Sequence, residues 1–465
     1  MKITLAQIKY KYANFDFNYQ NILNNFDNSA DINIFPEIET NSPMEFDSNY
    51  QEAKLKFYEN LCNYFKKNTI LVGKKLIKNG KLYDINKAYF DLKGKKIYVS
   101  DEYKDNINCD LYILAKNRYY AMNSHPEFVE NTVTHQDFIC INSIMLDGEN
   151  VYAGQGFAKN SRNEIVAEMP LLEEKIENID FSKNKKIKKY DTEEEIYKVT
   201  TFAIKEYCEN TGFKKVILGL SGGIDSALVA TLAKEAMGAN NVYAIMLPSK
   251  YSSVGSIKDS EKLAKKLKIN LKNISISPLF DCFMNNIADA QKMDLAEENL
   301  QSRLRGVILM FHSNRENCLL LSTGNKSEIA CGYGTLYGDM CGGLNVIADL
   351  TKTNVYKLSN WINRNEEIIP YEIIKKAPSA ELRPNQKDND SLPEYEILDK
   401  IIEDYIENKL AYEELISKYD KDTVDKTIKL IYRAQFKRNQ ACQGIRLTEQ
   451  AFCSNVKLPV LQSLY

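Results

Sequence analysis

The chain is poor in the residues that build metal centres and disulfide frameworks. It has only three histidines, His125, His135 and His312, among 465 residues. Its ten cysteines are scattered, and no two of them form a Cys-x-x-Cys pair. Neither a zinc site of cysteine and histidine ligands nor a disulfide-stabilised fold is therefore expected. Scattered thiols are typical of a reducing compartment, so we expect a cytoplasmic protein.

The chain also lacks an excess of charge of one sign and any long apolar run. Its 61 basic and 63 acidic residues leave a formal net charge of −2, which argues against a surface devoted to nucleic acid. No apolar run approaches the roughly 20 residues that cross a membrane, and the run after Met1 is too short for a signal peptide. A chain of this length predicts two domains, each able to bury its own core.

The most informative stretch lies near the middle of the chain. A short apolar run at 216–220 is followed by Ser-Gly-Gly-Ile-Asp-Ser at 221–226 and by a helical pattern that Gly238 ends. Glycines let a backbone approach a ligand closely, and the N-terminus of a helix attracts anions. The stretch lacks the Gly-x-x-x-x-Gly-Lys-Ser/Thr pattern of the P-loop. It resembles instead the pyrophosphate loop of ATP pyrophosphatases, which form adenylates; an ordinary strand-to-helix turn is the simpler alternative.

Strand and helix patterns divide the chain into two α/β domains. Residues 1–180 predict a β-rich domain with a long helix at 51–67. Glutamate and lysine dominate 171–190, which we interpret as a solvated linker. A capping-box pattern at Thr192 and Glu195 then opens a second domain, 190–465, whose alternating strands and helices predict a doubly wound parallel sheet. The predicted strands are 3–8, 32–35, 69–73, 88–91, 97–99, 111–114, 138–142, 216–220, 242–247, 271–276 and 319–322, and the predicted helices of the second domain include 256–267, 297–312 and 392–440.

Three polar clusters of the second domain are expected to converge, because ligands bind at the carboxyl ends of parallel strands. Asp225 in the loop could hold Mg²⁺ beside a polyphosphate, and Glu328 would be a second carboxylate for the metal. Asn299 and Arg303 share a helix face, and arginine suits bidentate recognition of phosphate or carboxylate. Taken alone, this pair is better explained as part of a solvent-exposed helix face.

Eight strings carry a resemblance to a known family, NAD synthetase of the glutamine-dependent bacterial type. They cover most of 190–465 in the family's order: Leu-Gly-Leu-Ser-Gly-Gly-Ile-Asp-Ser-Ala (218–227), Leu-Pro-Ser-Lys-Tyr-Ser-Ser (247–253), Glu-Asn-Leu-Gln-Ser-Arg-Leu-Arg-Gly (298–306), Ser-Thr-Gly-Asn-Lys-Ser-Glu (322–328), Gly-Thr-Leu-Tyr-Gly-Asp-Met (334–340), Pro-Ser-Ala-Glu-Leu-Arg-Pro (378–384), Asp-Ser-Leu-Pro (390–393) and Phe-Lys-Arg-Asn-Gln (436–440). The resemblance implies a nitrilase-like α/β sandwich before a synthetase domain of the adenine nucleotide α-hydrolase type.

The resemblance also implies an activity and a set of site residues. The activity is the ATP-dependent amidation of deamido-NAD through an acyl-adenylate, with ATP and Mg²⁺ in the site and a homo-oligomer as the assembly. Asp225 and Glu328 would hold the metal. The residues implied at ATP are Gly219, Leu220, Ser221, Gly222, Gly223, Ile224, Asp225, Ser226, Thr323, Lys352 and Ser379. Those implied at deamido-NAD are Asn299, Arg303, Glu328, Tyr333, Gly334, Thr335, Leu336 and Lys437.

In the family, a nitrilase-like domain hydrolyses glutamine to supply ammonia through a cysteine nucleophile, a glutamate base and a lysine. Residues 1–180 match it weakly. Glu37 stands at the glutamate position, but Ser100 stands where the cysteine is expected, and the segment that carries the lysine is missing. Serine is a poor substitute without an activating base. Cys109 is nearby but begins the next strand.

We therefore predict a degenerate amidase domain and ammonia as the nitrogen donor, free or supplied by a separate glutaminase. Three alternatives remain open. The protein could be a fully glutamine-dependent synthetase. It could be another adenylating enzyme, such as a tRNA-thiolating enzyme or an asparagine- or GMP-type synthetase. It could also be an inactive nucleotide sensor, against which the intact Asp225, Thr323, Glu328 and Lys437 argue.

Overall fold

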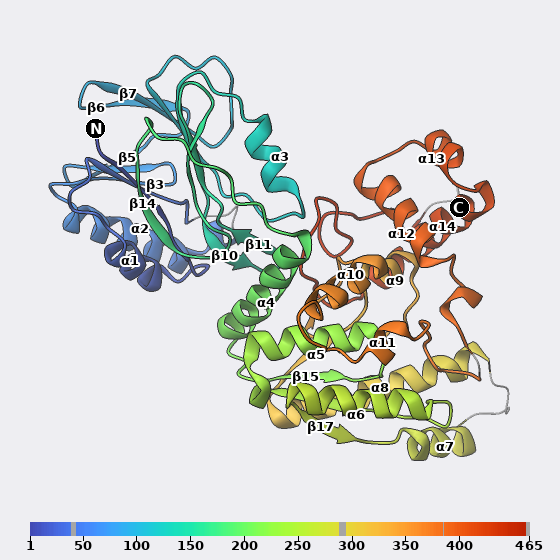
Figure 1. Ribbon diagram of the computed structural model, residues 1–465. Coiled ribbons are helices and arrows are strands. Elements are labelled where there is room, and N and C mark those ends of the chain that lie inside the picture. The colour runs from blue at the N-terminus through green and yellow to red at the C-terminus, as the bar shows by residue number, and fades with distance from the viewer. Residues whose placement is uncertain (39–42, 288–293, 385, 462–465) are drawn as a thin grey trace. The chain divides into compact units, whose positions relative to one another are not determined.

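The computed structural model describes residues 1–38, 43–287, 294–384 and 386–461. The chain forms two compact units, residues 1–195 and 196–465, which are considered separately (Figure 1). Each of the ten cysteines is a free thiol. In the described part of the chain, no helix is both long enough and apolar enough to cross a membrane.

The first unit contains two six-stranded sheets of mixed direction. In the first sheet β1, β2 and β3 are parallel, and in the second β7, β8 and β9 are parallel; antiparallel strands complete both. The first sheet has the order β14 (Lys175–Ile179), β1 (Ile3–Gln7), β2 (Ile32–Phe35), β3 (Thr69–Val72), β4 (Lys75–Lys78) and β5 (Lys81–Asp84). The second has the order β13 (Ile165–Glu168), β12 (Phe157–Lys159), β9 (Asp137–Ile141), β8 (Leu111–Ala115), β7 (Lys95–Ser100) and β6 (Ala88–Leu92), and a separate hairpin joins β10 (Ile144–Asp147) to β11 (Asn150–Ala153).

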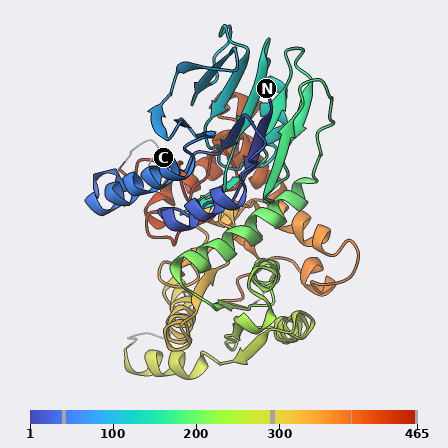
Figure 2. The ribbon, with the colours of Figure 1, turned by 90° about the vertical axis from the view of Figure 1, so that its left-hand side faces the viewer.

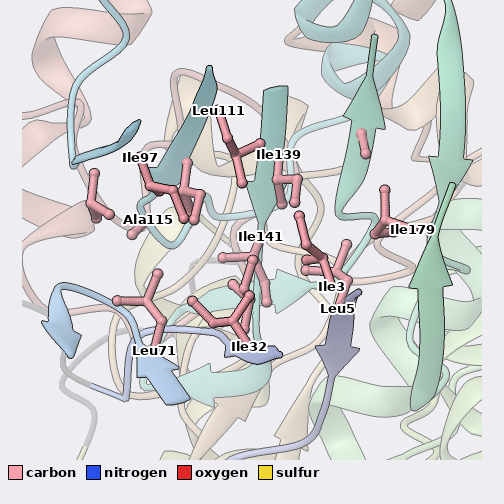
Figure 3. Close-up of a cluster of buried hydrophobic side chains, with 14 of the residues drawn as sticks. Ile3, Leu5, Ile32, Leu71, Ile97, Leu111, Ala115, Ile139, Ile141 and Ile179 are labelled. Atoms are coloured by element: carbon pink, nitrogen blue, oxygen red, sulfur yellow. The ribbon is translucent and has the colours of Figure 1, made fainter. Parts of the chain in front are cut away.

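The two sheets pack face to face, and helices cover their outer faces. Alternating side chains such as Ile32 and Ile34 from one sheet and Ile97 and Val99 from the other form the inner layer (Figure 3). Helices α1 (Phe15–Asn24) and α2 (Ser48–Tyr64), blue in Figure 2, pack on the outer face of the first sheet. Helix α3 (Ser124–Asn131) packs on the outer face of the second. The unit is thus a four-layered α/β sandwich, as predicted.

The linker predicted at 171–190 is wrong in part. Strand β14 lies within it and pairs antiparallel with β1 along its whole length. Its sequence, Lys-Ile-Glu-Asn-Ile, alternates charged and apolar residues and stands at the edge of the sheet, where charge is tolerated. The capping box at Thr192 and Glu195 stays a prediction. In the structure the Thr192 hydroxyl donates a hydrogen bond to Asn123 Oδ1 at 2.8 Å, and the Glu195 carboxylate accepts one from the Tyr120 hydroxyl at 3.3 Å.

The second unit is built on a five-stranded parallel sheet, in the order β17 (Asn270–Asn273), β16 (Val242–Met246), β15 (Val216–Gly219), β18 (Leu319–Ser322) and β19 (Leu344–Asn345). The strand order reverses between β15 and β18, so a crevice opens beyond their carboxyl ends. Strand β15 is buried from Val216 to Leu218, as a strand covered on both faces requires. This unit therefore confirms the predicted doubly wound sheet.

Helices surround this sheet and extend from it. They are α4 (Thr192–Thr211), which begins in the first unit, α5 (Ile224–Met237), α6 (Val254–Leu267), α7 (Ser277–Asn286), α8 (Leu295–Glu316), α9 (Lys326–Cys331), α10 (Lys352–Ile362) and α11 (Tyr371–Lys375). The helical tract predicted at 392–440 is instead a series of short helices, α12 (Tyr395–Ile402), η4 (Glu403–Glu407), α13 (Tyr412–Lys418), α14 (Lys421–Arg433) and α15 (Gln435–Arg438). Short 3₁₀ turns occur at η1 (Pro43–Phe46), η2 (Ala239–Asn241) and η3 (Asp388–Asp390).

Candidate functional site

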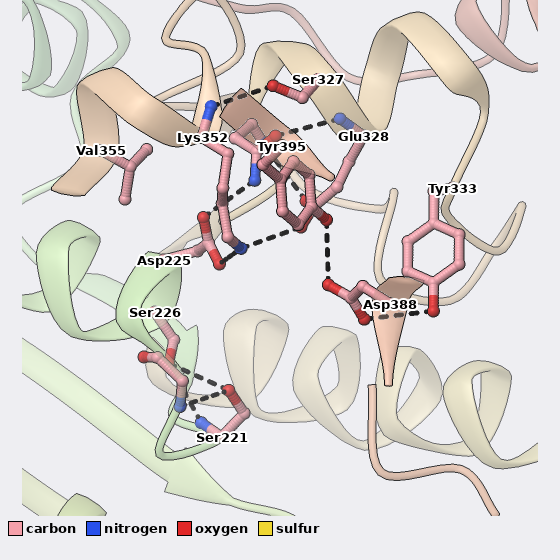
Figure 4. A network of polar contacts seen from close by, with 12 residues as sticks. Ser221, Asp225, Ser226, Ser327, Glu328, Tyr333, Lys352, Val355, Asp388 and Tyr395 are labelled. Carbon is pink, nitrogen blue, oxygen red and sulfur yellow. Dashed lines mark hydrogen bonds and ion pairs between the residues drawn. The ribbon is translucent and has the colours of Figure 1, made fainter. Parts of the chain in front are cut away.

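The loop at 219–226, here called the phosphate loop, connects β15 to α5 at the strand-order reversal. Its own hydroxyls hold it in shape. Gly223 N–H donates to Ser221 Oγ at 3.2 Å, Ser226 Oγ donates to the Gly223 carbonyl at 3.0 Å, and Ser221 N–H donates to Ser226 Oγ at 3.3 Å (Figure 4). Helix α5 starts directly after Gly223. The first N–H groups of a 14-residue helix therefore face the crevice, where they favour an anion.

Gly222 is required by both its conformation and its surroundings. Its φ of +79° lies in the left-handed region, which other residues avoid. A Cβ atom at this position would lie 2.3 Å from the carbonyl oxygen of Ser256, at the start of α6. The backbone of the phosphate loop thus passes directly against α6.

Two carboxylates and one ammonium group meet beside this loop. Lys352 Nζ lies 2.5 Å from Asp225 Oδ2 and 3.4 Å from Glu328 Oε1 (Figure 4). Asn325 connects the two acids, because its side-chain amide donates to Asp225 at 2.9 Å and its side-chain oxygen accepts from Glu328 N–H at 3.0 Å. The cluster joins the start of α5, the start of α9 and the start of α10.

The charges of this cluster depend on one another. Burial opposes the charge on Lys352, but Asp225 and Glu328 outweigh that effect and raise the Lys352 pKa above its ordinary value. Burial raises the pKa of Glu328, while the Lys352 ammonium opposes that shift. Burial also raises the pKa of Asp388, which accepts hydrogen bonds from the hydroxyls of Tyr395 at 2.9 Å and Tyr333 at 3.2 Å. Lys352 is therefore a cation that stays charged at neutral pH.

A cavity of about 310 Å³ joins these groups at the carboxyl end of the sheet. Every residue that the sequence assigned to ATP lines it, and so do three of those assigned to deamido-NAD. The lining residues predicted at ATP are Gly219, Leu220, Ser221, Gly222, Gly223, Ile224, Asp225, Ser226, Thr323, Lys352 and Ser379. Those predicted at deamido-NAD are Glu328, Tyr333 and Gly334.

The other five residues assigned to deamido-NAD are not in the lining, but hydrogen bonds tie them to its edge. Thr335 Oγ1 donates to Asn299 Oδ1 at 2.7 Å, and Arg303 Nε donates to the Leu336 carbonyl at 3.2 Å. Lys437 Nζ donates to the carbonyls of Gly332 and Gly334, at 2.8 and 2.7 Å. The structure therefore brings α8, the 332–338 loop and α15 together on one side of the cavity.

Ser379, which the resemblance assigns to ATP, belongs to a longer segment whose other residues had no predicted role. Residues 376–382 line the cavity and are tied to the start of α6. Lys376 Nζ lies 2.7 Å from Asp259 Oδ2, and the Glu381 carboxylate accepts from the hydroxyls of Ser253 at 2.9 Å and Ser256 at 2.7 Å. The string at 378–384 was recognised, but only the structure shows what its glutamate contacts.

Lys326, just before the acidic cluster, is the centre of a buried network that sequence analysis missed. Its ammonium lies 2.8 Å from both Asp349 Oδ1 and Glu407 Oε1, and it donates to Thr448 Oγ1 at 2.8 Å. Both the Lys326 and the Asp349 side chains have 0% exposure. The network fixes the start of α9, which carries Asn325 and Glu328, to the C-terminal segment.

Replacing Lys326 with methionine should lower the free energy of unfolding by about 3–5 kcal/mol, because the buried Asp349 loses its cation. The matched control is Lys272→Met, which breaks a surface pair with Glu316 at 3.7 Å and should cost at most about 1 kcal/mol. Urea unfolding measures both variants. Equal losses would show that the Lys326 network contributes no more than a surface pair.

In the first unit, a lysine does reach Glu37, but from an unexpected position. Lys74 Nζ lies 2.8 Å from Glu37 Oε1 and 3.5 Å from Asp101 Oδ2. The turn that carries it packs tightly on Glu37, since a Cβ atom on Gly73 would lie 2.7 Å from Glu37 Cβ. Lys95 is paired with Asp110 elsewhere. The sequence could not indicate Lys74, because it stands outside the segment in which the family's lysine occurs.

The two candidate nucleophiles of this unit lie in different surroundings. Ser100 is fully buried, and its Oγ accepts a hydrogen bond from Glu102 N–H at 3.1 Å. Burial raises the pKa of Cys109 to about 11, so its thiol carries its proton at neutral pH. Glu37, at the position of the family's glutamate base, is paired with the Lys74 ammonium.

Comparison with known proteins points to one family. A protein-family model described as NAD synthase matches residues 196–441. A glutamine-dependent NAD(+) synthetase of Synechocystis sp. is 38% identical over 393 residues, which cover 80% of this chain and 70% of that relative. One from Thermotoga maritima is 44% identical over 274 residues, covering 58% of this chain and only 48% of that relative.

Solved structures extend the likeness to both units. Glutamine-dependent NAD+ synthetase from Acinetobacter baumannii, in complex with ADP, matches with a TM-score of 0.74 at 28% identity, over 99% of this chain and 98% of that chain. Glutamine-dependent NAD(+) synthetase from Cytophaga hutchinsonii shares the fold, with a TM-score of 0.84 at 17% identity, over 100% of this chain and 98% of that chain.

Proposed function

Because the chain belongs to the NAD synthase family, we propose that it amidates deamido-NAD to NAD at the expense of ATP. The observation that carries this proposal is the cavity in the second unit. It combines a phosphate loop with the Asp225–Lys352–Glu328 cluster and adjoins the group of Asn299, Arg303 and Lys437. ATP would lie over the loop, and deamido-NAD would enter beside α8 and α15.

The proposed reaction has two steps. A carboxylate oxygen of deamido-NAD attacks the α-phosphorus of ATP, the bond from that phosphorus to the bridging oxygen breaks, and pyrophosphate leaves. Ammonia then attacks the acyl carbon, AMP leaves with the bond electrons, and the nitrogen loses a proton to solvent. Neither step needs a nucleophilic side chain; positioning and neutralisation of charge lower the barrier.

The residues of the cavity suit that work. The backbone N–H groups of Gly222 to Ser226 would hold the departing pyrophosphate, and the glycines allow the close approach. Lys352 brings a positive charge that burial does not remove. Lys437 is held by two backbone carbonyls at the edge of the cavity, where it would meet the pyrophosphate of the dinucleotide.

Asp225 and Glu328 fit the requirements of Mg²⁺, which prefers carboxylate oxygens and commonly takes one or two of them together with phosphate oxygens. In the described part of the chain, no group of three or more histidine, cysteine, aspartate or glutamate side chains is placed to hold a metal, so these two acids would share the ion with the nucleotide. When bound, the ion would neutralise charge on the phosphates. The Lys352 ammonium, now 2.5 Å from Asp225, would move toward the phosphates.

We propose that ammonia, not glutamine, is the nitrogen donor. The support comes from the first unit, where Ser100 is buried and Glu37 is paired with Lys74. The relatives named above are glutamine-dependent, which is the specific reason to keep glutamine as the second candidate.

The purified protein should form NAD with ammonium as the nitrogen donor. With glutamine the rate should be at least about 100-fold lower, since no thiolate stands at the position of the family's cysteine and Glu37 is paired with Lys74. Product formation is measured with each donor separately. Ser100→Ala and Cys109→Ala are the matched variants, and both should leave the ammonium-supported rate unchanged. The proposal would be contradicted if glutamine supported a rate comparable to that with ammonium and either variant abolished it. A glutamine-derived adduct on Ser100 or Cys109 would contradict it too.

A further inference from the structure

Arg305, on α8, stands out among the charged residues that line the cavity. The basic residues of the lining are Arg305, Lys352 and Lys376. Lys352 is paired with Asp225 and Glu328, and Lys376 with Asp259. Arg305 makes no ion pair with any residue that the structure describes. Among the described basic residues of the lining, it is the one that no carboxylate pairs with.

The orientation of Arg305 is nevertheless fixed. Its Nε donates a hydrogen bond to the Leu247 carbonyl at 3.0 Å, which leaves both terminal amino groups of the guanidinium free of hydrogen bonds to described residues. Gly306, the next residue, packs closely on the 337–341 loop, because a Cβ atom there would lie 2.8 Å from the Tyr337 carbonyl oxygen. Helix α8 therefore cannot easily shift away from the cavity at this point.

The guanidinium of Arg305 is charged at neutral pH, and the nearest carboxylates do not pair with it. Burial lowers the pKa of Arg305 to about 10, and Asp339 and Glu381 act in the opposite direction from a distance. Asp339 is engaged by the Thr335 N–H at 2.6 Å, and Glu381 by Ser253 and Ser256. A partly desolvated guanidinium with free donors is complementary to a ligand anion.

The sheet register indicates which anion this is. Strands β15 and β16 are parallel, with Gly219 paired to Ile245. Ser221 and Leu247 each lie two residues beyond that pair, so the carbonyl that holds Arg305 is near the level of the first hydroxyl of the phosphate loop. Both residues line the cavity, so a nucleotide bound over the phosphate loop as proposed above would carry its phosphate chain past the guanidinium.

We propose that Arg305 is a substrate-binding residue that contacts the phosphate chain of ATP from the side opposite the phosphate loop. This inference rests on the proposed function and extends it, since it assigns to α8 a role at ATP in addition to the role of Arg303 at the dinucleotide. Arg305 would hold the α-phosphate side of the chain while pyrophosphate departs into the loop.

The test compares Arg305→Gln and Arg305→Lys with the wild type. For Arg305→Gln, kcat/KM for ATP should fall by about 10- to 100-fold, the usual worth of a charge-assisted hydrogen bond, while KM for deamido-NAD at saturating ATP stays within twofold. Arg305→Lys keeps the positive charge but loses the two parallel N–H donors of the guanidinium. Its kcat/KM for ATP should therefore lie between those of the wild type and Arg305→Gln. The control is Arg315→Gln, an exposed arginine further along α8 that stacks on Phe311; its kinetics should match the wild type.

The shift in melting temperature on adding ATP alone gives a second readout, and it should shrink in both Arg305 variants. Unchanged ATP kinetics and an unchanged ATP shift would overturn the proposal. A rise in KM for deamido-NAD alone would overturn the assignment to ATP. If Arg305→Gln does not fold, wild-type ATP parameters in Arg305→Lys would likewise overturn it. Failure of the wild type to convert deamido-NAD would defeat the proposed function instead, and the ATP shift would still decide the role of Arg305.

Discussion

Asp225→Asn should lower kcat for NAD formation by about 100- to 1000-fold, the size of the loss when one electrostatic contact to a transition state is removed, because this carboxylate would act on the phosphates through Mg²⁺. The substitution keeps the shape of the side chain but removes the negative charge that lies 2.5 Å from Lys352. It also leaves Glu328 as the only one of the two acids able to hold Mg²⁺. The concentration of Mg²⁺ that gives half the maximal rate should therefore rise as the rate falls.

Steady-state assays over a series of Mg²⁺ concentrations measure this effect. The matched control is Asp425→Asn, because Asp425 is exposed on the C-terminal helix α14, where it accepts a hydrogen bond from the Tyr412 hydroxyl at 2.7 Å. Its rate and its Mg²⁺ dependence should equal those of the wild type. A slow Asp225→Asn enzyme with an unchanged Mg²⁺ dependence would assign Asp225 to orienting Lys352 and not to the metal.

How far the sequence could predict the fold depended on whether the local pattern and the tertiary environment agreed. Strand β15 and helix α5 were found because an apolar run and a one-sided helix are both buried as their patterns require. Strands β4 and β5 were missed because neither shows the expected pattern: β4 has only two buried apolar residues, between two lysines, and β5 is exposed throughout. Strand β14 was missed because its sequence has no continuous apolar pattern. It is a strand because it pairs with β1.

The residues of the site likewise fall into those that the sequence could predict and those that only the three-dimensional structure reveals. The phosphate loop, Asp225 and Glu328 lie in continuous strings, so the sequence could point to them before any geometry was known. Arg305 and Glu381 lie in such strings too, but their importance depends on which partners they lack or gain in three dimensions. Lys74 had no signal at all, because its role depends on a turn that packs against Glu37 from another part of the first sheet.

The phosphate loop itself is open to a direct steric test. Gly222→Ala should reduce kcat/KM for ATP by about 100-fold or more, because a displacement of about 1 Å at a reacting group can cost that much. The new methyl group would lie 2.3 Å from the Ser256 carbonyl oxygen and 2.7 Å from Ser256 Cα, both of them backbone atoms that no side-chain rotation can move. The left-handed φ of +79° adds about 1–2 kcal/mol of strain, and the overpacking about 1–3 kcal/mol.

Gly238→Ala, at the other end of α5, separates the two causes. Gly238 has almost the same φ, +78°, but no atom lies within 4 Å of the position that its Cβ would take. This variant should lose about 1–3 kcal/mol of stability from its positive-φ backbone conformation alone and keep wild-type kinetics. Urea unfolding and ATP kinetics are measured on both variants. If Gly222→Ala lost no more activity than Gly238→Ala, close contact between the phosphate loop and α6 would not be needed for binding ATP, and the loop would have to act through its conformation alone.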